Sequence, residues 1–145
     1  MRIWHYELLP YLPDAQFKGQ LRELVAIMHD WRDKGKTNHL LINKVVEYPK
    51  SELGGYFLEY ALEYCRRYNK PISLKINSEF VSFCGGVAES PPFKNSWHNK
   101  DYLRVCMANL YEKHIFGIGK SRITDEEWAR LCKGYEQITG EQYAI

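Results

Sequence analysis

The chain has 145 residues, of which 45% are hydrophobic and 26% are charged, and its formal net charge is +2. A chain of this length fits one compact domain, and this composition excludes an intrinsically disordered protein. The net charge is too small to indicate a nucleic-acid partner by itself.

Neither a membrane segment nor an export signal is predicted. The longest apolar runs, such as residues 24–28, are far shorter than the roughly 20 residues that a membrane-spanning helix needs. His5, Glu7 and two prolines interrupt the start of the chain, where a signal peptide would be apolar. The four cysteines lack a C-x-x-C spacing, which favours reduced, mostly buried thiols over a zinc site. We therefore expect one cytoplasmic domain over residues 1–145, without metal or cofactor.

Apolar residues with helical spacing follow Pro13, which suits the first turn of a helix. They recur at i, i+4, i+7, i+11 and i+14 and form one narrow stripe: Phe17, Leu21, Leu24, Met28 and Trp31. Gly35 is a typical C-terminal cap. The pattern predicts a helix over residues 14–31 with this stripe facing the core.

The rest of the chain also favours helices. A shorter helix is expected over residues 38–48, and one from Ser51 to about residue 69 carries two apolar faces, which predicts a central position. Residues 71–98 contain Gly-Gly and Pro-Pro without a sustained helical period, so an irregular segment is expected there. Helices are predicted over residues 101–114 and from Thr124, where Glu127 completes a capping box, to Gly140. The predicted fold class is all-α, a compact single-domain bundle of about four to five helices.

The aromatic residues outside these stripes are assigned to the core. Tyrosines recur at helical spacing at positions 56, 60, 64 and 68, and Trp97-His98 follows an apolar loop. Contact with DNA bases is the alternative for both groups. The five histidines show no metal-ligand spacing, and surface or capping positions are expected for them.

The side of the first helix opposite its core stripe carries unusually small residues. Ala15, Gly19 and Ala26 lie there together with Arg22, and Glu23 lies at the margin. A glycine in the middle of a helix costs about 1 kcal/mol relative to alanine, which suggests a compensating role. Either another helix packs against Gly19 and the two charges are solvated, or the face admits a ligand.

The start of the chain is too apolar for a free end. Ile3, Trp4 and Tyr6 predict that it packs against the domain and holds its α-amine in place. An α-amine has a pKa of about 7.7 to 8.0, so roughly a tenth of it is the neutral nucleophile at pH 7. Such an amine can attack a carbon atom without further tuning.

Three motifs together resemble a known enzyme family: Met1-Arg2, Leu12-Pro13-Asp14 and Leu21-Arg22-Glu23-Leu24. They are similar to motifs of the phage-type pyrimidine-dimer DNA glycosylases, the endonuclease V family of T-even phages. Weaker similarity continues along most of the chain, for example at Gly35-Lys36 and Asp101-Tyr102-Leu103.

The resemblance implies a helical DNA repair enzyme with both glycosylase and abasic-site lyase activity. The amine of Met1 would attack C1′ of the damaged nucleotide and form an imine, while Glu23 would assist base loss and β-elimination. Arg2 and Arg22 would hold phosphates around the lesion. The implied partner is double-stranded DNA with a damaged base, such as a pyrimidine dimer, or an abasic site, and a monomer is expected.

Two lysines, Lys34 and Lys36, could also contact DNA phosphates, a role that needs no fixed spacing. A solvated loop is the alternative for both.

The chain departs from the family's pattern at three positions. The family has an arginine where Ala26 stands and a histidine where Gln16 stands, and it removes its initiator methionine to expose a threonine. Here Met1 precedes the large Arg2, so either Met1 itself presents the amine or the nucleophile is missing. The alternative function is a non-catalytic DNA-binding or protein-interaction domain with the same fold.

Overall fold

All regular elements are helical in the computed structural model, which describes residues 2–39, 42–87, 93 and 96–144. The α-helices are α1 (Asp14–Lys34), α2 (Lys50–Tyr68), α3 (Leu74–Cys84), α4 (Lys100–Phe116) and α5 (Asp125–Thr139). Short 3-10 helices are η1 (Tyr6–Tyr11), η2 (Asn43–Glu47) and η3 (Gly119–Ser121). The all-α prediction is confirmed.

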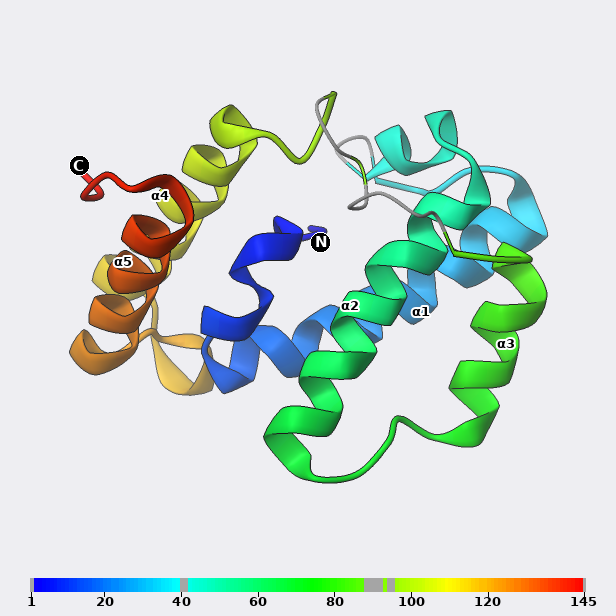
Figure 1. The fold of residues 1–145 in the computed structure, drawn as a ribbon, viewed down its shortest axis with the longest axis horizontal. Coiled ribbons are helices and arrows are strands. Elements are labelled where there is room, and N and C mark those ends of the chain that lie inside the picture. The colour runs from blue at the N-terminus through cyan, green and yellow to red at the C-terminus, as the bar shows by residue number, and fades with distance from the viewer. Residues whose placement is uncertain (1, 40–41, 88–92, 94–95, 145) are drawn as a thin grey trace.

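The helices form two pairs that are joined by the start of the chain and by α1. Figure 1 shows α2 beside α3 on one side of the molecule and α4 beside α5 on the other, with α1 passing behind α2. The 3-10 helix η1 lies between these pairs and contacts both α2 and α5. Ile3, Leu8 and Leu12 are fully buried, so the first residues of the chain are part of the core.

The predicted helix ends agree with the cap geometry. α1 ends at Gly35, which adopts the left-handed conformation with φ 74°. α5 begins with the expected capping box, in which Thr124 accepts from the Glu127 amide while the Glu127 carboxylate accepts from the Thr124 amide. The apolar stripe of α1 faces the core, with Phe17, Leu24 and Met28 fully buried.

The expectation of an irregular segment over residues 71–98 is wrong in its first part, where α3 forms. Ser73 caps this helix by accepting from the Ile76 amide, and Gly85 ends it. The helical pattern is hard to see because Leu74 and Val81 are 81% and 73% exposed, so apolar residues lie on both faces. Residues 88–92, 94 and 95 lie outside the described part of the chain.

Two other expectations are corrected. The helix predicted over residues 38–48 is limited to the 3-10 helix η2, because the Asn43 side chain accepts from the Thr37 amide and holds a loop in place of a helical turn; residues 40 and 41 lie outside the described part. The second apolar face of α2 is not covered, since Leu58 and Leu62 are 44% and 60% exposed. α2 is therefore not enclosed by the other helices.

The cysteines are free thiols in the structure. Cys84 and Cys106 are buried, but Cys65 is exposed and Cys132 is partly exposed, so the expectation of mostly buried thiols holds for only half of them. A membrane crossing would need a longer and more apolar helix than any in the described residues.

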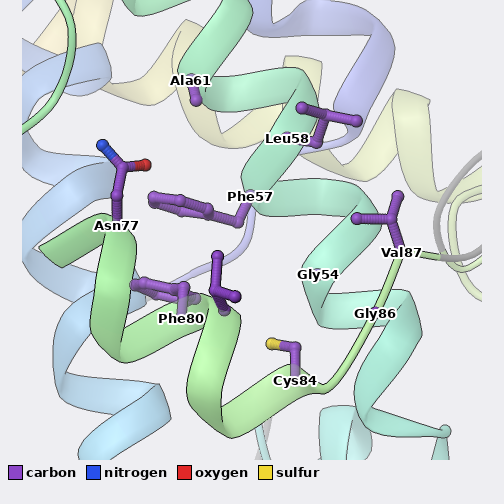
Figure 2. A pocket seen from close by; sticks show the side chains of 10 residues that line it. Gly54, Phe57, Leu58, Ala61, Asn77, Phe80, Cys84, Gly86 and Val87 are labelled. Atoms are coloured by element: carbon purple, nitrogen blue, oxygen red, sulfur yellow. The ribbon is translucent and has the colours of Figure 1, made fainter. Parts of the chain in front are cut away.

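A close backbone approach joins α2 to the segment that follows α3. A Cβ atom built on Gly54 would lie 2.3 Å from the Gly86 carbonyl oxygen and 3.2 Å from the Cys84 Cβ. Figure 2 shows these residues at one end of an apolar cleft of about 210 Å³. Gly19 on α1 is different, because a Cβ there would meet only the Arg22 guanidinium, at 3.5 Å.

We expect Gly54→Ala to destabilise the protein by about 1 to 3 kcal/mol or more, because the added methyl group would collide with backbone. Gly19→Ala is the matched control in a second helix and should stabilise the protein by up to about 1 kcal/mol. Chemical unfolding of both variants measures the difference. A Gly54→Ala protein as stable as the wild type would show that the close approach is not rigid.

Candidate active site

The start of the chain lies against α1 at Glu23. The Arg2 backbone amide donates to Oε2 of Glu23 at 3.0 Å. Glu23 is partly exposed, in contrast to Leu24 beside it, which is fully buried. The first described residue of the chain is therefore in direct contact with the carboxylate that the sequence singled out. Met1 itself lies outside the described residues.

Gln20, one turn before Glu23, binds the same segment with both ends of its amide. Its Oε1 accepts from the Trp4 amide at 2.8 Å, and its Nε2 donates to the Arg2 carbonyl at 2.8 Å. Nε2 also lies 3.4 Å from Oε2 of Glu23. Gln20 is 1% exposed, so its contact to Trp4 is made away from solvent, while those to Arg2 and Glu23 are partly buried.

Two tyrosine hydroxyls bind the remaining carbonyls of this segment. Tyr56 of α2 donates to the Trp4 carbonyl at 2.6 Å, and Tyr102 of α4 donates to the Ile3 carbonyl at 2.5 Å. Burial raises the pKa of both phenols, so they remain protonated donors at neutral pH. Residues 2–4 are thus held by α1, α2 and α4 together.

Gln20 and Glu23, which make these contacts, belong to a polar stripe on α1. Gln16, Gln20 and Glu23 stand at i, i+4 and i+7 and share one face of the helix. Gln16 is also buried, and its Nε2 donates to the Ser121 carbonyl of η3 at 2.9 Å. Each member of the stripe therefore binds backbone from a distant part of the chain.

The structure places the Arg2 backbone against Glu23, with Arg22 directly before Glu23 on α1. The Arg2 guanidinium lies 5.7 Å from the centre of the Trp4 ring, and Arg22 is exposed on the open face beside Gly19. As predicted, Ala15 on this face is exposed, and Gly19 and Ala26 are partly exposed.

The two predicted lysines do not join this group. Lys34 follows Glu23 by eleven residues, which places it about 16 Å along the helix axis, on nearly the same face. It is exposed and pairs with Asp30 at 3.7 Å. Lys36 is exposed in the turn after α1.

A basic and aromatic cleft of about 300 Å³ lies beside Arg22, between α1 and the end of α2. Its lining combines one leucine with cations and tyrosines: Lys18, Leu21, Arg22, Tyr60, Tyr64, Tyr68 and Lys70. Cations bind phosphates and aromatic rings stack on bases, so the composition of this cleft suits nucleic acid. Tyr60 is fully buried, which confirms its assignment to the core, whereas Tyr64 and Tyr68 are partly exposed.

The apolar cleft of Figure 2 has a different character. Its side chains, from α2, α3 and the segment after α3, are almost all hydrocarbon. Cys84 is the one titratable group in its lining, and burial raises the pKa of that thiol to about 11. This cleft therefore offers no charge for acid, base or phosphate chemistry, in contrast to the surroundings of Glu23. No cluster of three potential metal ligands occurs in the described residues.

Two buried histidines, His5 and His98, contact the start of the chain. They correct the expectation that all histidines lie at the surface or in caps. His98 is 4% exposed, accepts from the Tyr6 amide at 3.1 Å and stacks on His5 with ring centres 5.1 Å apart. His5 does cap η1, as its Nδ1 accepts from the Glu7 amide, yet it is only 1% exposed. Burial lowers the pKa of His5 to about 4 and that of His98 well below its usual value.

Sequence reasoning singled out Glu23 and Arg22 as candidates but not Gln20, Tyr56 or Tyr102, which bind the same segment of the chain. The spacing of Gln16, Gln20 and Glu23 was the available signal, because three long polar residues on one helix face next to a core stripe can bind a buried segment. Nothing in the sequence marked the two tyrosines, which have the same pattern as core residues.

Comparison with known proteins gives one family. Residues 1–75 match the family model described as pyrimidine dimer DNA glycosylase, and this match covers just over half of the chain. It includes α1, α2 and the whole segment from Arg2 to Glu23. No curated protein and no solved structure matched significantly.

The buried histidines predict how stability depends on pH. Both have a folded pKa below the unfolded value of about 6.5, so the unfolded chain binds protons first as the pH falls. The free energy of unfolding should therefore be highest above about pH 6.5. Below that pH it should fall by up to about 1.4 kcal/mol per pH unit for each histidine. Urea unfolding between pH 7 and pH 5 measures this slope.

The variant His5→Asn is the control for this prediction, because asparagine can still accept from the Glu7 amide but does not titrate. It should reduce the slope by about half and leave the contribution of His98. An unchanged slope would mean that His5 binds protons equally in the folded and the unfolded chain, and that burial does not lower its pKa.

Proposed function

The chain belongs to the pyrimidine dimer DNA glycosylase family, and on this premise we propose that it removes a damaged base and then nicks the strand through an imine. Membership makes it a DNA repair glycosylase with DNA as its substrate. The finer proposal is that residues 1–145 act as one domain on pyrimidine dimers or a related lesion, and that the same site has abasic-site lyase activity.

One observation carries the proposed mechanism: the Arg2 amide nitrogen lies 3.0 Å from the Glu23 carboxylate. The α-amine proposed as the nucleophile belongs to Met1, the residue directly before it. Consecutive Cα atoms are only about 3.8 Å apart, so an amine at that position can reach a sugar that also contacts Glu23.

The chemistry follows from these two groups. The neutral Met1 amine attacks C1′, a C–N bond forms, and the bond to the base breaks with its electron pair leaving on the base, which takes up a proton. Opening of the sugar ring at its C1′–O4′ bond gives the imine. Glu23 stabilises the cationic sugar and then removes the C2′ proton. The resulting electron pair expels the 3′ phosphate, which nicks the strand, and water hydrolyses the imine to release the enzyme.

The cations of the site are proposed to hold the phosphates. Arg22 directly precedes Glu23, and Arg2 contacts Glu23 through its backbone amide. Their guanidinium groups would bind the phosphates next to the lesion, where a guanidinium can make paired hydrogen bonds. Lys34 and Lys36 would bind phosphates further along the duplex, at the end of α1. The open face at Gly19 would allow the distorted nucleotide to approach the helix closely.

We expect borohydride to trap a covalent adduct when the protein is mixed with DNA that contains an abasic site, and the added mass should map to Met1. Glu23→Gln should lower the rate of strand cleavage by about 100-fold or more, because the amide cannot accept the C2′ proton. Its binding to the same DNA should change little. The control is Glu112→Gln, the same substitution at an exposed glutamate of α4, and this variant should cleave at the wild-type rate.

These outcomes separate the proposal from its alternative. A non-catalytic DNA-binding domain would bind the DNA without an adduct, and Glu23→Gln would then leave every measured property unchanged. An adduct that maps to a lysine would reject Met1 as the nucleophile.

Extension of the chain before Met1 provides a second test. Two added residues would move the amine away from Glu23 by several ångströms, and a displacement of about 1 Å already lowers rates by about 100-fold. Cleavage and trapping should both be lost while DNA binding is retained. The same two residues added after Ile145 are the control and should have no effect. An active protein with the N-terminal extension would contradict the mechanism.

A further inference from the structure

We propose that Gln20 is the positioning residue of this site, which holds the start of the chain and the Glu23 carboxylate in a fixed relation to each other. The inference rests on the proposed function, because it assigns Gln20 a role in the chemistry of Met1 and Glu23. Gln20 acts through these groups and does not touch the reacting atoms.

The contacts of Gln20 fix its amide in one orientation. The Trp4 N–H can only donate, and the Arg2 carbonyl can only accept, so the oxygen of the amide faces Trp4 and the nitrogen faces Arg2. The Tyr56 hydroxyl lies 3.1 Å from the same oxygen, but its single proton is donated to the nearer Trp4 carbonyl at 2.6 Å, so the Trp4 amide and the Arg2 carbonyl set the orientation. The nitrogen then also faces the Glu23 carboxylate, at 3.4 Å.

One side chain therefore replaces the neighbouring strand that an extended segment would otherwise need. Its two ends bind the backbone on either side of Ile3 in the way that a paired strand would. A leucine would fill the same buried volume without binding either group. The contacts show that this position does more than fill space, because every hydrogen-bonding atom of the amide is directed at the site.

Loss of Gln20 should leave the segment attached but free to shift. Tyr56 and Tyr102 would still bind the Trp4 and Ile3 carbonyls, and the Ile3 side chain would remain in the core. The Arg2 carbonyl, which of these three carbonyls is the one closest in sequence to Met1, would lose its hydrogen bond to Gln20. The fold would persist, while the amine and the carboxylate would no longer be held within reach of one deoxyribose.

The experiment compares Gln20→Leu with Gln16→Leu, a change on the same helix face that breaks only a contact to η3. The readouts are the rate of borohydride trapping with abasic-site DNA, the affinity for that DNA and amide hydrogen exchange of residues 2–4. Gln20→Leu should trap at least about 30-fold more slowly, bind within about threefold of the wild type and lose protection at the Trp4 amide. Gln16→Leu should keep the wild-type trapping rate.

Gln20→Glu adds a readout that a purely structural residue would not change. Its carboxylate can accept from the Trp4 amide but places a second acid about 3.4 Å from Glu23, and like charges at that distance raise the pKa of one of the two. The acidic limb of the trapping rate against pH should therefore move upward by about one pH unit or more. Should Gln20→Leu fail to fold, this profile and the exchange of the Trp4 amide decide the question.

The outcomes distinguish the two levels of the proposal. If the wild type traps DNA but both Gln20 variants have its rate, pH profile and exchange, the positioning role is wrong and the proposed function stands. If the wild type forms no adduct, the proposed function fails and the catalytic role of Gln20 fails with it.

Discussion

The structure depends on an extended segment that has no strand beside it. Ile3 and Trp4 are buried, and the peptide groups of a buried segment need hydrogen-bond partners because an unpaired one is strongly unfavourable. The described residues contain no β-sheet to provide them. Side chains of α1, α2 and α4 provide them, and this requirement brings Gln20, Tyr56 and Tyr102 together around residues 2–4. The position of the chain start is thus a consequence of hydrogen-bond satisfaction.

The same constraint continues along η1 and joins the two helix pairs. Arg67 near the end of α2 donates to the Leu9 and Leu12 carbonyls, and its guanidinium lies 4.1 Å from the centre of the Phe17 ring. Glu63 is 7% exposed and accepts from Arg67 at 2.7 Å, so the buried carboxylate is paired. On the other side, Arg130 of α5 donates to a carbonyl of η1. Backbone carbonyls near the start of the chain therefore fix α2 and α5 relative to α1.

The sequence could predict the elements whose signal is local. α1 and α5 combine one apolar stripe with cap residues, and both signals arise within the helix itself. α3 was missed because its exposed leucine and valine blur the period, and the contacts that bury Phe80 come from α2. Glu23 could be proposed from the sequence because it lies at the margin of the small-residue face of α1. The burial of Gln20 depends on residues 2–4 packing against it, which no helical pattern within α1 can show.

α1 consequently has two polar faces with different properties, and Glu23 stands at their border. On one side, Gln16 and Gln20 are buried and each binds backbone from a distant part of the chain, which makes that side rigid. On the other side, Arg22 is exposed beside Gly19 and next to the basic cleft, where a phosphate can approach. A carboxylate at this border can be fixed by the Arg2 amide and still reach a molecule on the open side. Preorganised charge accelerates a reaction because it needs no rearrangement during the reaction, and this border position combines that rigidity with access.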